Sequence, residues 1–153
     1  MNISKINLFD IANGPGIRVS LFVSGCNFHC KGCFNETAQD FNAGIKYTQE
    51  HENLILNRLK HPDFKGLSIL GGDPLCQNEK DLKILLDLCK KVKALNKDIW
   101  IWSGFYKTEL NMLQNDLINE CDYFVDGRFE ESLKDLTLPW RGSSNQHIIK
   151  IRP

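Results

Sequence analysis

Three cysteines lie close together in the run Cys26-Asn-Phe-His-Cys30-Lys-Gly-Cys33, and these side chains are the most chemically distinctive part of the sequence. Three thiolates in one short loop can bind three irons of a [4Fe–4S] cluster, which ordinarily takes four cysteines. The loop has no fourth cysteine, and no later pair of cysteines has ligand spacing. One iron would therefore keep an open coordination position, which S-adenosylmethionine (SAM) can fill by chelation through its amino and carboxylate groups.

The same loop also allows a structural zinc ion, with His29 or a distant cysteine as the fourth ligand. Zinc ribbons and fingers usually pair two close cysteines with a second, separate pair of ligands, whereas this chain has one close group, spaced x3 and then x2. A thiol redox role for Cys30 and Cys33 would leave Cys26 unexplained. The spacing therefore favours a cluster, and a non-enzymatic metal or electron-transfer module stays open as an alternative.

The other three cysteines are scattered along the chain. Cys76 is expected near the mouth of the site, where a single thiol decides little. Cys89 falls on the apolar face of a predicted helix and Cys121 at a helix end, so both are expected to be packing residues.

Hydrophobic periodicity predicts alternating strands and helices around these residues. The predicted strands are 18–23, 66–70, 99–102, 123–125 and a last short one at 148–151, and the predicted helices are about 49–60, 80–93 and 107–119. This alternation implies right-handed crossovers and mainly parallel strands. A complete eight-fold barrel needs about 250 residues. The sequence therefore predicts one α/β domain over residues 1–153, built as an open, partial (β/α) barrel.

The unusual motifs follow the predicted strands in order. The cysteine loop follows the first strand, Gly71-Gly72-Asp73 the second, Ser103-Gly104 the third and Asp126-Gly127 the fourth. Function gathers at the carboxyl ends of the strands in such sheets. We therefore expect the four segments to converge on one edge of the sheet.

Composition excludes several other classes of protein. The chain has 42% apolar and 25% charged residues, and 19 basic residues balance 19 acidic ones. The sequence has no basic stripe, so nucleic acid is not an expected partner. It also has no apolar run or leader pattern of the kind that directs a chain to a membrane. A cytoplasmic location is expected, and there a close cysteine group binds metal more often than it forms disulfides.

Cys26-x3-Cys30-x2-Cys33 resembles the signature of the radical SAM superfamily. Within it, the chain resembles the family of glycyl-radical enzyme activases that serve the anaerobic ribonucleoside-triphosphate reductase. The matching segments come in the family's order and span the chain: Asn13-Gly-Pro-Gly-Ile-Arg18, Leu21-Phe-Val-Ser-Gly-Cys26, Gly71-Gly-Asp-Pro-Leu75, Trp102-Ser-Gly104, Val125-Asp-Gly-Arg-Phe129 and Trp140-Arg-Gly-Ser-Ser-Asn-Gln146.

The resemblance implies a radical SAM type of fold and supplies a reaction. Reduced by a low-potential electron donor, a [4Fe–4S] cluster would cleave SAM, and a glycyl radical would form on the large subunit of the reductase. An activase of another glycyl-radical enzyme, such as pyruvate formate-lyase, is the nearer alternative. Members of that group are usually longer and lack the pattern at 141–146.

The resemblance also implies the site residues. Cys26, Cys30 and Cys33 would hold the cluster, with no catalytic residue beyond them. Gly71, Gly72 and Asp73 would meet the SAM amino group, although paired glycines also suit a tight strand-to-helix turn.

Gly32, Cys33 and Phe34 would lie near the adenine, and packing in the core is the competing interpretation of Phe34. Ser103, where the family often has Thr, would serve a ribose or a backbone cap. Asp126 would reach the ribose or the partner, although Asp-Gly is equally good turn chemistry.

The roles of Arg128 and of the segment 141–146 are not fixed by these patterns. Since the resemblance concentrates in that segment, we expect it to dock the partner or to close the site.

Overall fold

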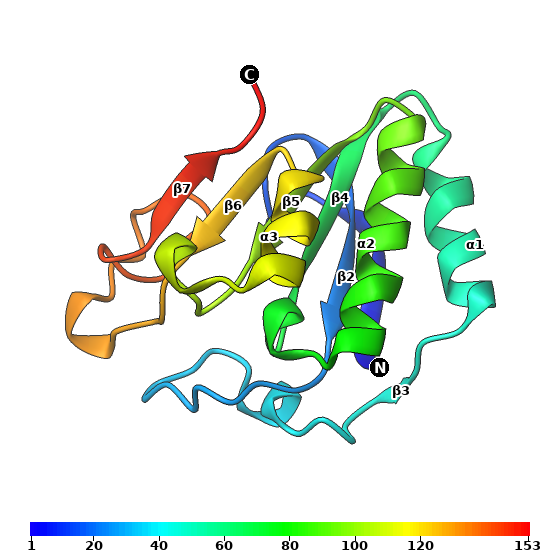
Figure 1. Cartoon of the computed structure of the whole chain (residues 1–153). Coiled ribbons are helices and arrows are strands. Elements are labelled where there is room, and N and C mark those ends of the chain that lie inside the picture. Colours follow the sequence, from blue (N-terminus) through cyan, green and yellow to red (C-terminus); the bar gives the residue numbers. More distant parts are fainter.

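A seven-stranded sheet, ordered β3-β1-β2-β4-β5-β6-β7, is the frame of the computed structural model, which describes residues 1–153 (Figure 1). The strands are β1 (Asn2–Asp10), β2 (Ile17–Val23), β3 (Ile45–Lys46), β4 (Phe64–Gly71), β5 (Asp98–Trp102), β6 (Tyr123–Asp126) and β7 (His147–Lys150). The α-helices are α1 (Gln49–Leu59), α2 (Glu79–Ala94) and α3 (Met112–Asn119), and short 3-10 turns lie at Glu36–Gln39, Pro74–Cys76, Lys107–Glu109 and Glu131–Leu133. None of the helices combines the length and the apolar character that a membrane span requires.

The centre of the sheet is parallel. β2, β4, β5 and β6 pair side by side in chain order, and a helix connects each of them to the next. Because right-handed crossovers that advance in one direction place their helices on the same side, α1, α2 and α3 all lie on one face (Figure 1).

The main core lies between these helices and the sheet. Alternate strand residues such as Val19, Leu21, Ile69 and Ile101 belong to one buried apolar cluster, which the helices complete with residues such as Leu85. The period of two along the strands thus places the intervening side chains on the opposite face. That second face carries polar and aromatic residues and continues into the functional site.

The expected elements are present, with two corrections. The chain over 107–119 is not one helix, because the Asn111 side chain accepts from the Gln114 amide (2.9 Å) and caps a new helix there, after a 3-10 turn at Lys107–Glu109. The sequence pattern also missed β1 and β3. Within β1 only Ile3 and Asp10 are buried, so no alternation marks it, and β3 is two residues long.

The prediction of mainly parallel strands holds only for the centre of the sheet. β1, β3 and β7 are antiparallel to their neighbours, so three of the six strand pairings are antiparallel. No pairing joins the edge strands β3 and β7, and the sheet is open. An open mixed α/β sheet is therefore what the structure has, without barrel closure.

Candidate functional site

A cavity of about 550 Å³ lies where the parallel strands end. Eight of the ten residues predicted for the site line it, namely Cys26, Cys30, Cys33, Phe34, Gly71, Gly72, Asp73 and Ser103. Gly32 and Asp126 do not line it. The expected convergence of the four strand-end segments is confirmed, because the residues that follow β2, β4, β5 and β6 all contribute to its wall.

The pairing of β2 with β4 positions the first two segments. It continues beyond the strands through bonds from the Gly72 amide to the Val23 carbonyl (2.7 Å) and from the Asp73 amide to the Gly25 carbonyl (2.8 Å). A Cβ at position 72 would lie 2.4 Å from the Ala38 carbonyl oxygen and 2.7 Å from the Gly25 backbone. Glycine is therefore required at 72 for the cysteine loop to lie against the end of β4.

The cysteine loop is closed by its own backbone. The amides of Gly25 and Cys26 donate to the carbonyls of Ala38 (2.7 Å) and Gln39 (3.0 Å), so the chain returns to its starting point. Within the loop, the Cys33 amide donates to the Cys30 carbonyl (3.1 Å). Gly32 supplies the positive φ of 74° in that turn, which gives it a backbone role outside the cavity wall.

Two of the three thiols of the loop, Cys26 and Cys33, have backbone amides pointing at their sulfurs. The amides of Phe28 and Asn35 point at the sulfurs of Cys26 (3.5 Å) and Cys33 (3.4 Å). The neighbouring Cys76 thiol, aided by the Phe28 amide, lowers the pKa of Cys26 to about 7, despite its burial. Burial raises the pKa of Cys30.

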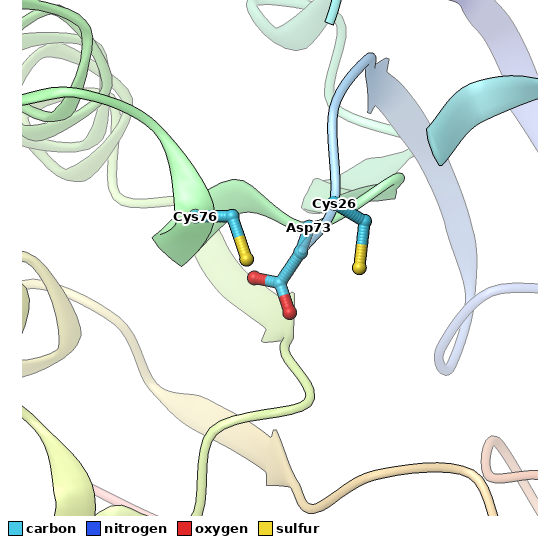
Figure 2. A group of neighbouring side chains, drawn as sticks. All are labelled: Cys26, Asp73 and Cys76. Carbon is cyan, nitrogen blue, oxygen red and sulfur yellow. The ribbon is translucent and has the colours of Figure 1, made fainter. Parts of the chain in front are cut away.

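The spacing of the sulfurs separates a cluster from a single ion. A tetrahedral zinc ion with bonds of about 2.3 Å needs ligand sulfurs about 3.8 Å apart. The group of three ligand-type atoms that lie within 4.8 Å of one another is Cys26, Asp73 and Cys76, and it does not include Cys30 or Cys33 (Figure 2). A cluster binds each thiolate to a different iron, so the three thiols of the loop fit a cluster better than one zinc.

The other proposed zinc ligand, His29, is not part of the group formed by Cys26, Asp73 and Cys76. Its Nδ1 lies 2.8 Å from the Gln39 side-chain oxygen at the far end of the loop. Cys89 and Cys121 are completely buried in the main core, as expected of packing residues.

Asp73 connects the ends of β4 and β5. Its buried carboxylate accepts hydrogen bonds from the Leu75 amide (2.8 Å), the Gly104 amide (2.7 Å) and the Ser103 hydroxyl (2.8 and 3.0 Å). Burial outweighs these bonds and raises the pKa of Asp73 to about 6. Ser103 Oγ also accepts from the Phe105 amide (3.1 Å), so the hydroxyl serves as a backbone cap.

Two further residues had open interpretations. Phe34 is 65% exposed and contacts Phe129 at the cavity, with ring centroids 4.9 Å apart, so it is not a core residue. The carboxylate of Asp126 is buried and accepts from the Lys107 amide (2.9 Å), while its other oxygen lies 2.8 Å from Nδ1 of His147. In this arrangement Asp126 holds the turn after β6.

The segment 127–146 covers the remaining side of the cavity. Phe129, Leu136 and Trp140, which are not among the site residues that the sequence predicts, line the cavity together with Arg141, Gly142 and Gln146. The signal for Phe129 and Trp140 is their place in the matching runs 125–129 and 140–146, and Leu136 lies in neither run. Nothing in the periodicity around these residues marks them as cavity lining.

Internal bonds hold this segment in place. Gln146 bridges its two ends, accepting from the amides of Gly142 (2.8 Å) and Ser143 (3.1 Å) and donating to the Gly127 carbonyl (2.9 Å). Trp102 Nε1 donates to the Trp140 carbonyl (2.7 Å) and fastens the segment to the end of β5. Arg141, Gly142 and Gln146 line the cavity, and a role of the segment 141–146 in partner docking or site closure stays a prediction.

Arg128 lies at the edge of the site, where its guanidinium stacks 4.6 Å from the Phe28 ring centroid and pairs with Glu109 at 3.0 Å. It thus connects the cysteine loop to the chain beyond β5.

Comparison with known proteins gives a consistent result over almost the whole chain. A family profile described as a 4Fe-4S single cluster domain matches residues 12–149. A Vibrio cholerae protein named anaerobic ribonucleoside-triphosphate reductase-activating protein is 43% identical over 152 residues, which cover 97% of each chain. The protein of the same name from Escherichia coli K12 is 40% identical to this chain over 156 residues, which cover 99% of this chain and 100% of that protein. One from phage T4 is 37% identical over 149 residues, covering 97% and 93%.

Proposed function

This chain belongs to the anaerobic ribonucleoside-triphosphate reductase-activating proteins, and we propose that it reductively cleaves SAM at a [4Fe–4S] cluster and generates a glycyl radical on the reductase large subunit. Membership of the family and the 4Fe-4S domain are shown by the comparisons. SAM cleavage at the cluster and formation of a glycyl radical are what we propose beyond this. A low-potential electron donor is required as a further partner.

The observation that carries the proposal is the arrangement of three thiols on one loop at a shared cavity. Cys26, Cys30 and Cys33 all line it, and Cys76 does not. Three irons would be held and the fourth left open toward a space of about 550 Å³, which falls in the range of small-molecule sites. A cluster bound there would supply the single electron that breaks a carbon–sulfur bond of SAM.

The residues of the chain bind and orient the reactants. Gly71 and Gly72 expose backbone at the cavity wall, where the SAM amino group would be received, and Asp73 and Ser103 fix the loops on either side. Phe34 offers an exposed aromatic face beside Cys33 for the adenine, with Gly32 shaping the turn between them. Asp126 would contribute by holding the turn after β6.

Site closure is proposed for the segment 127–146. Trp140 and Phe129 place apolar surface over the cavity and limit the access of solvent, which restricts side reactions of a reactive intermediate. The exposed apolar residues there, Phe34, Leu136 and Trp140, leave the outer rim suited to a polypeptide partner.

The test is anaerobic reconstitution with iron and sulfide, reduction with dithionite, and electron paramagnetic resonance with and without SAM. We expect a [4Fe–4S]⁺ signal that changes when SAM is added and is absent from Cys30→Ala. Cys76→Ala is the matched control, since it removes a nearby thiol outside the cavity wall and should keep the signal. Addition of the reductase large subunit should then give the resonance of a glycyl radical.

Retention of one tightly bound zinc, with no cluster formed under any of these conditions, would instead identify a structural metal module. A cluster whose resonance signal does not change when SAM is added would indicate electron transfer without SAM cleavage. A SAM-responsive cluster that activates only another glycyl-radical enzyme would reassign the partner.

A further inference from the structure

We propose that Cys26, Asp73 and Cys76 form a second, mononuclear site for a thiophilic divalent cation such as Zn²⁺ or Fe²⁺, which is occupied only when the cluster is absent. Cys76 has no part in the proposed SAM chemistry, and it lies on the 3-10 turn after β4, opposite the loop that follows β2. Figure 2 shows the sulfurs of Cys26 and Cys76 on either side of the Asp73 carboxylate.

The geometry is that of a single-ion site. The two sulfurs and a carboxylate oxygen lie within 4.8 Å of one another. Tetrahedral zinc, with bonds of about 2.3 Å to sulfur and about 2.0–2.2 Å to oxygen, needs ligand atoms slightly less than 4 Å apart, so small side-chain rotations complete the site. Cys26 and Asp73 also line the cavity, which gives water access to the fourth position.

The Asp73 carboxylate has room for a cation. Its oxygens offer about four lone-pair positions. The donors in hydrogen-bond geometry are the amides of Leu75 and Gly104 and the single hydroxyl proton of Ser103, which is shared between both oxygens. The Cys76 amide is also near this carboxylate, and it donates to the backbone carbonyl of Asp73 (3.2 Å). One position is left, and metal-binding carboxylates are themselves hydrogen-bonded in this manner.

Charge favours the same conclusion. Asp73 is 2% exposed, and none of the ion pairs in the structure includes it. A buried carboxylate without a positive partner is costly, and a bound cation would give Asp73 a direct partner of opposite charge. Binding would displace the protons of the Cys26 and Cys76 thiols into solvent, giving two thiolate bonds and one carboxylate bond.

Cys26 belongs to both sites, so the two forms exclude each other. The Cys26 sulfur can bind either an iron of the cluster or the single ion, because the cluster site and the mononuclear site meet at this residue. The mononuclear site needs neither SAM nor the reductase. Its existence is therefore independent of whether the proposed reaction occurs.

The experiment uses the full-length chain, freed of metal with a chelator and reductant under anaerobic conditions and titrated with Co²⁺. We expect one equivalent to bind, with cobalt–thiolate charge-transfer absorption and the intense visible bands of tetrahedral cobalt. Cys76→Ala should lose these bands, and Asp73→Asn should weaken binding by at least about tenfold, since even outer-shell changes cost 10–100-fold. Circular dichroism of each variant checks that the fold is kept.

Cys30→Ala is the matched counterpart, because Cys30 lies on the cluster loop outside the proposed ion site. Cys30→Ala should keep the cobalt bands and lose the cluster. Cys76→Ala should lose the cobalt bands and keep the cluster. Bands that survive in Cys76→Ala and vanish in Cys30→Ala would place the ion on the loop cysteines and overturn the proposal. Absence of tetrahedral bands from the unsubstituted protein would overturn it as well.

A second measurement covers the case in which Cys76→Ala is unstable. Unsubstituted protein preloaded with one equivalent of Zn²⁺ should assemble its cluster more slowly from iron and sulfide than the zinc-free protein does. Equal rates of assembly would show that the single ion does not occupy Cys26, and the proposed exclusion would be wrong.

Discussion

At the scale of single residues, Asp73 organises the site more than any other side chain outside the cysteines. Its carboxylate receives hydrogen bonds from the turn after β4 and from both residues of the Ser103-Gly104 segment after β5. The carboxyl ends of two strands are therefore fixed relative to each other by one buried group. Ser103 is the side-chain half of this connection.

Replacement of Ser103 by Ala tests that connection. The change removes the hydroxyl donor from a buried carboxylate, so we expect the free energy of unfolding to fall by about 1–3 kcal/mol. Urea unfolding of the cluster-free, reduced protein measures it. Ser103→Thr keeps the hydroxyl and should cost clearly less than Ala, and equal losses for the two variants would show that the hydrogen bond contributes nothing.

At the scale of elements, the cysteine loop depends on close backbone contact with the end of β4. Gly72 lies against the Ala38 carbonyl and the Gly25 backbone, which cannot move without disturbing the loop that begins at Cys26. The glycine pair after β4 therefore has a packing reason that is independent of any ligand.

For this contact, Gly72→Ala should destabilise the protein by about 1–3 kcal/mol, as overpacking against a rigid neighbour does. Gly142→Ala is the matched comparison, because a Cβ there meets the rings of Phe34 and Phe129, and Phe34 is exposed and free to rotate. In thermal unfolding, Gly72→Ala should have a lower midpoint temperature than Gly142→Ala. The opposite ranking would mean that the loop adjusts more easily than the aromatic pair.

The turn from β1 to β2 is ordered by a second buried carboxylate, Asp10. It accepts from the Ala12 amide (2.8 Å), the Asn13 side chain (2.7 Å) and the Ser20 hydroxyl (2.6 Å). Burial alone would raise the pKa of Asp10, but these bonds outweigh burial and hold the pKa below its usual value. Asn13, which lines the cavity, is held by this turn.

A lowered pKa gives the folded state an advantage above the unfolded value of about 3.9, and that advantage disappears as the pH falls through the folded value. We therefore expect the stability difference between the unsubstituted protein and Asp10→Asn to be constant near neutral pH and to shrink below about pH 5. Urea unfolding over a pH series measures it. Ser20→Ala removes one of the hydrogen bonds to Asp10 and should make this loss of stability in acid smaller. A stability difference that grows in acid would contradict the role given to Asp10.

At the scale of the whole molecule, Arg18 joins three central strands on the face opposite the helices. It is fully buried, donates to Ser68 Oγ (2.7 Å) and the Leu67 carbonyl (2.9 Å) on β4, and lies 2.6 Å from the Asp98 carboxylate on β5. The contact with Asp98 is an ion pair by distance, without the alignment of a hydrogen bond. The open sheet is thus held together at the amino ends of its strands by a charged group.

Asp98→Asn would leave the Arg18 charge without its counter-ion. We expect a loss of about 3 kcal/mol, the lower end of the range for breaking a buried pair, because Asp98 is partly exposed. The control is Glu109→Gln, which breaks an exposed pair with Arg128 and should leave the urea midpoint nearly unchanged. Similar midpoints for the two variants would show that Arg18 is stabilised by its neutral acceptors alone.

The sequence alone was sufficient for the cysteine loop, the β–α alternation and the gathering of Gly71, Asp73 and Ser103 at one edge. These features depend on short-range spacing and on the rule that parallel strands end together, and both can be read along the chain. From its length, the chain was expected to form an open, partial barrel, and the sheet is indeed open. Its antiparallel edges were not expected, because β1 and β3 carry no periodic pattern that marks them as strands.

Only the tertiary structure decided which distant residues meet. Cys76 lies 50 positions after Cys26, and their contact depends on the register of β2 against β4, which aligns Val23 with Gly71. The covering of the cavity by Trp140 likewise depends on β7 returning antiparallel to β6. Spacing along a chain fixes what a loop can bind, whereas contacts between loops follow from strand register and direction, which packing of the whole sheet determines.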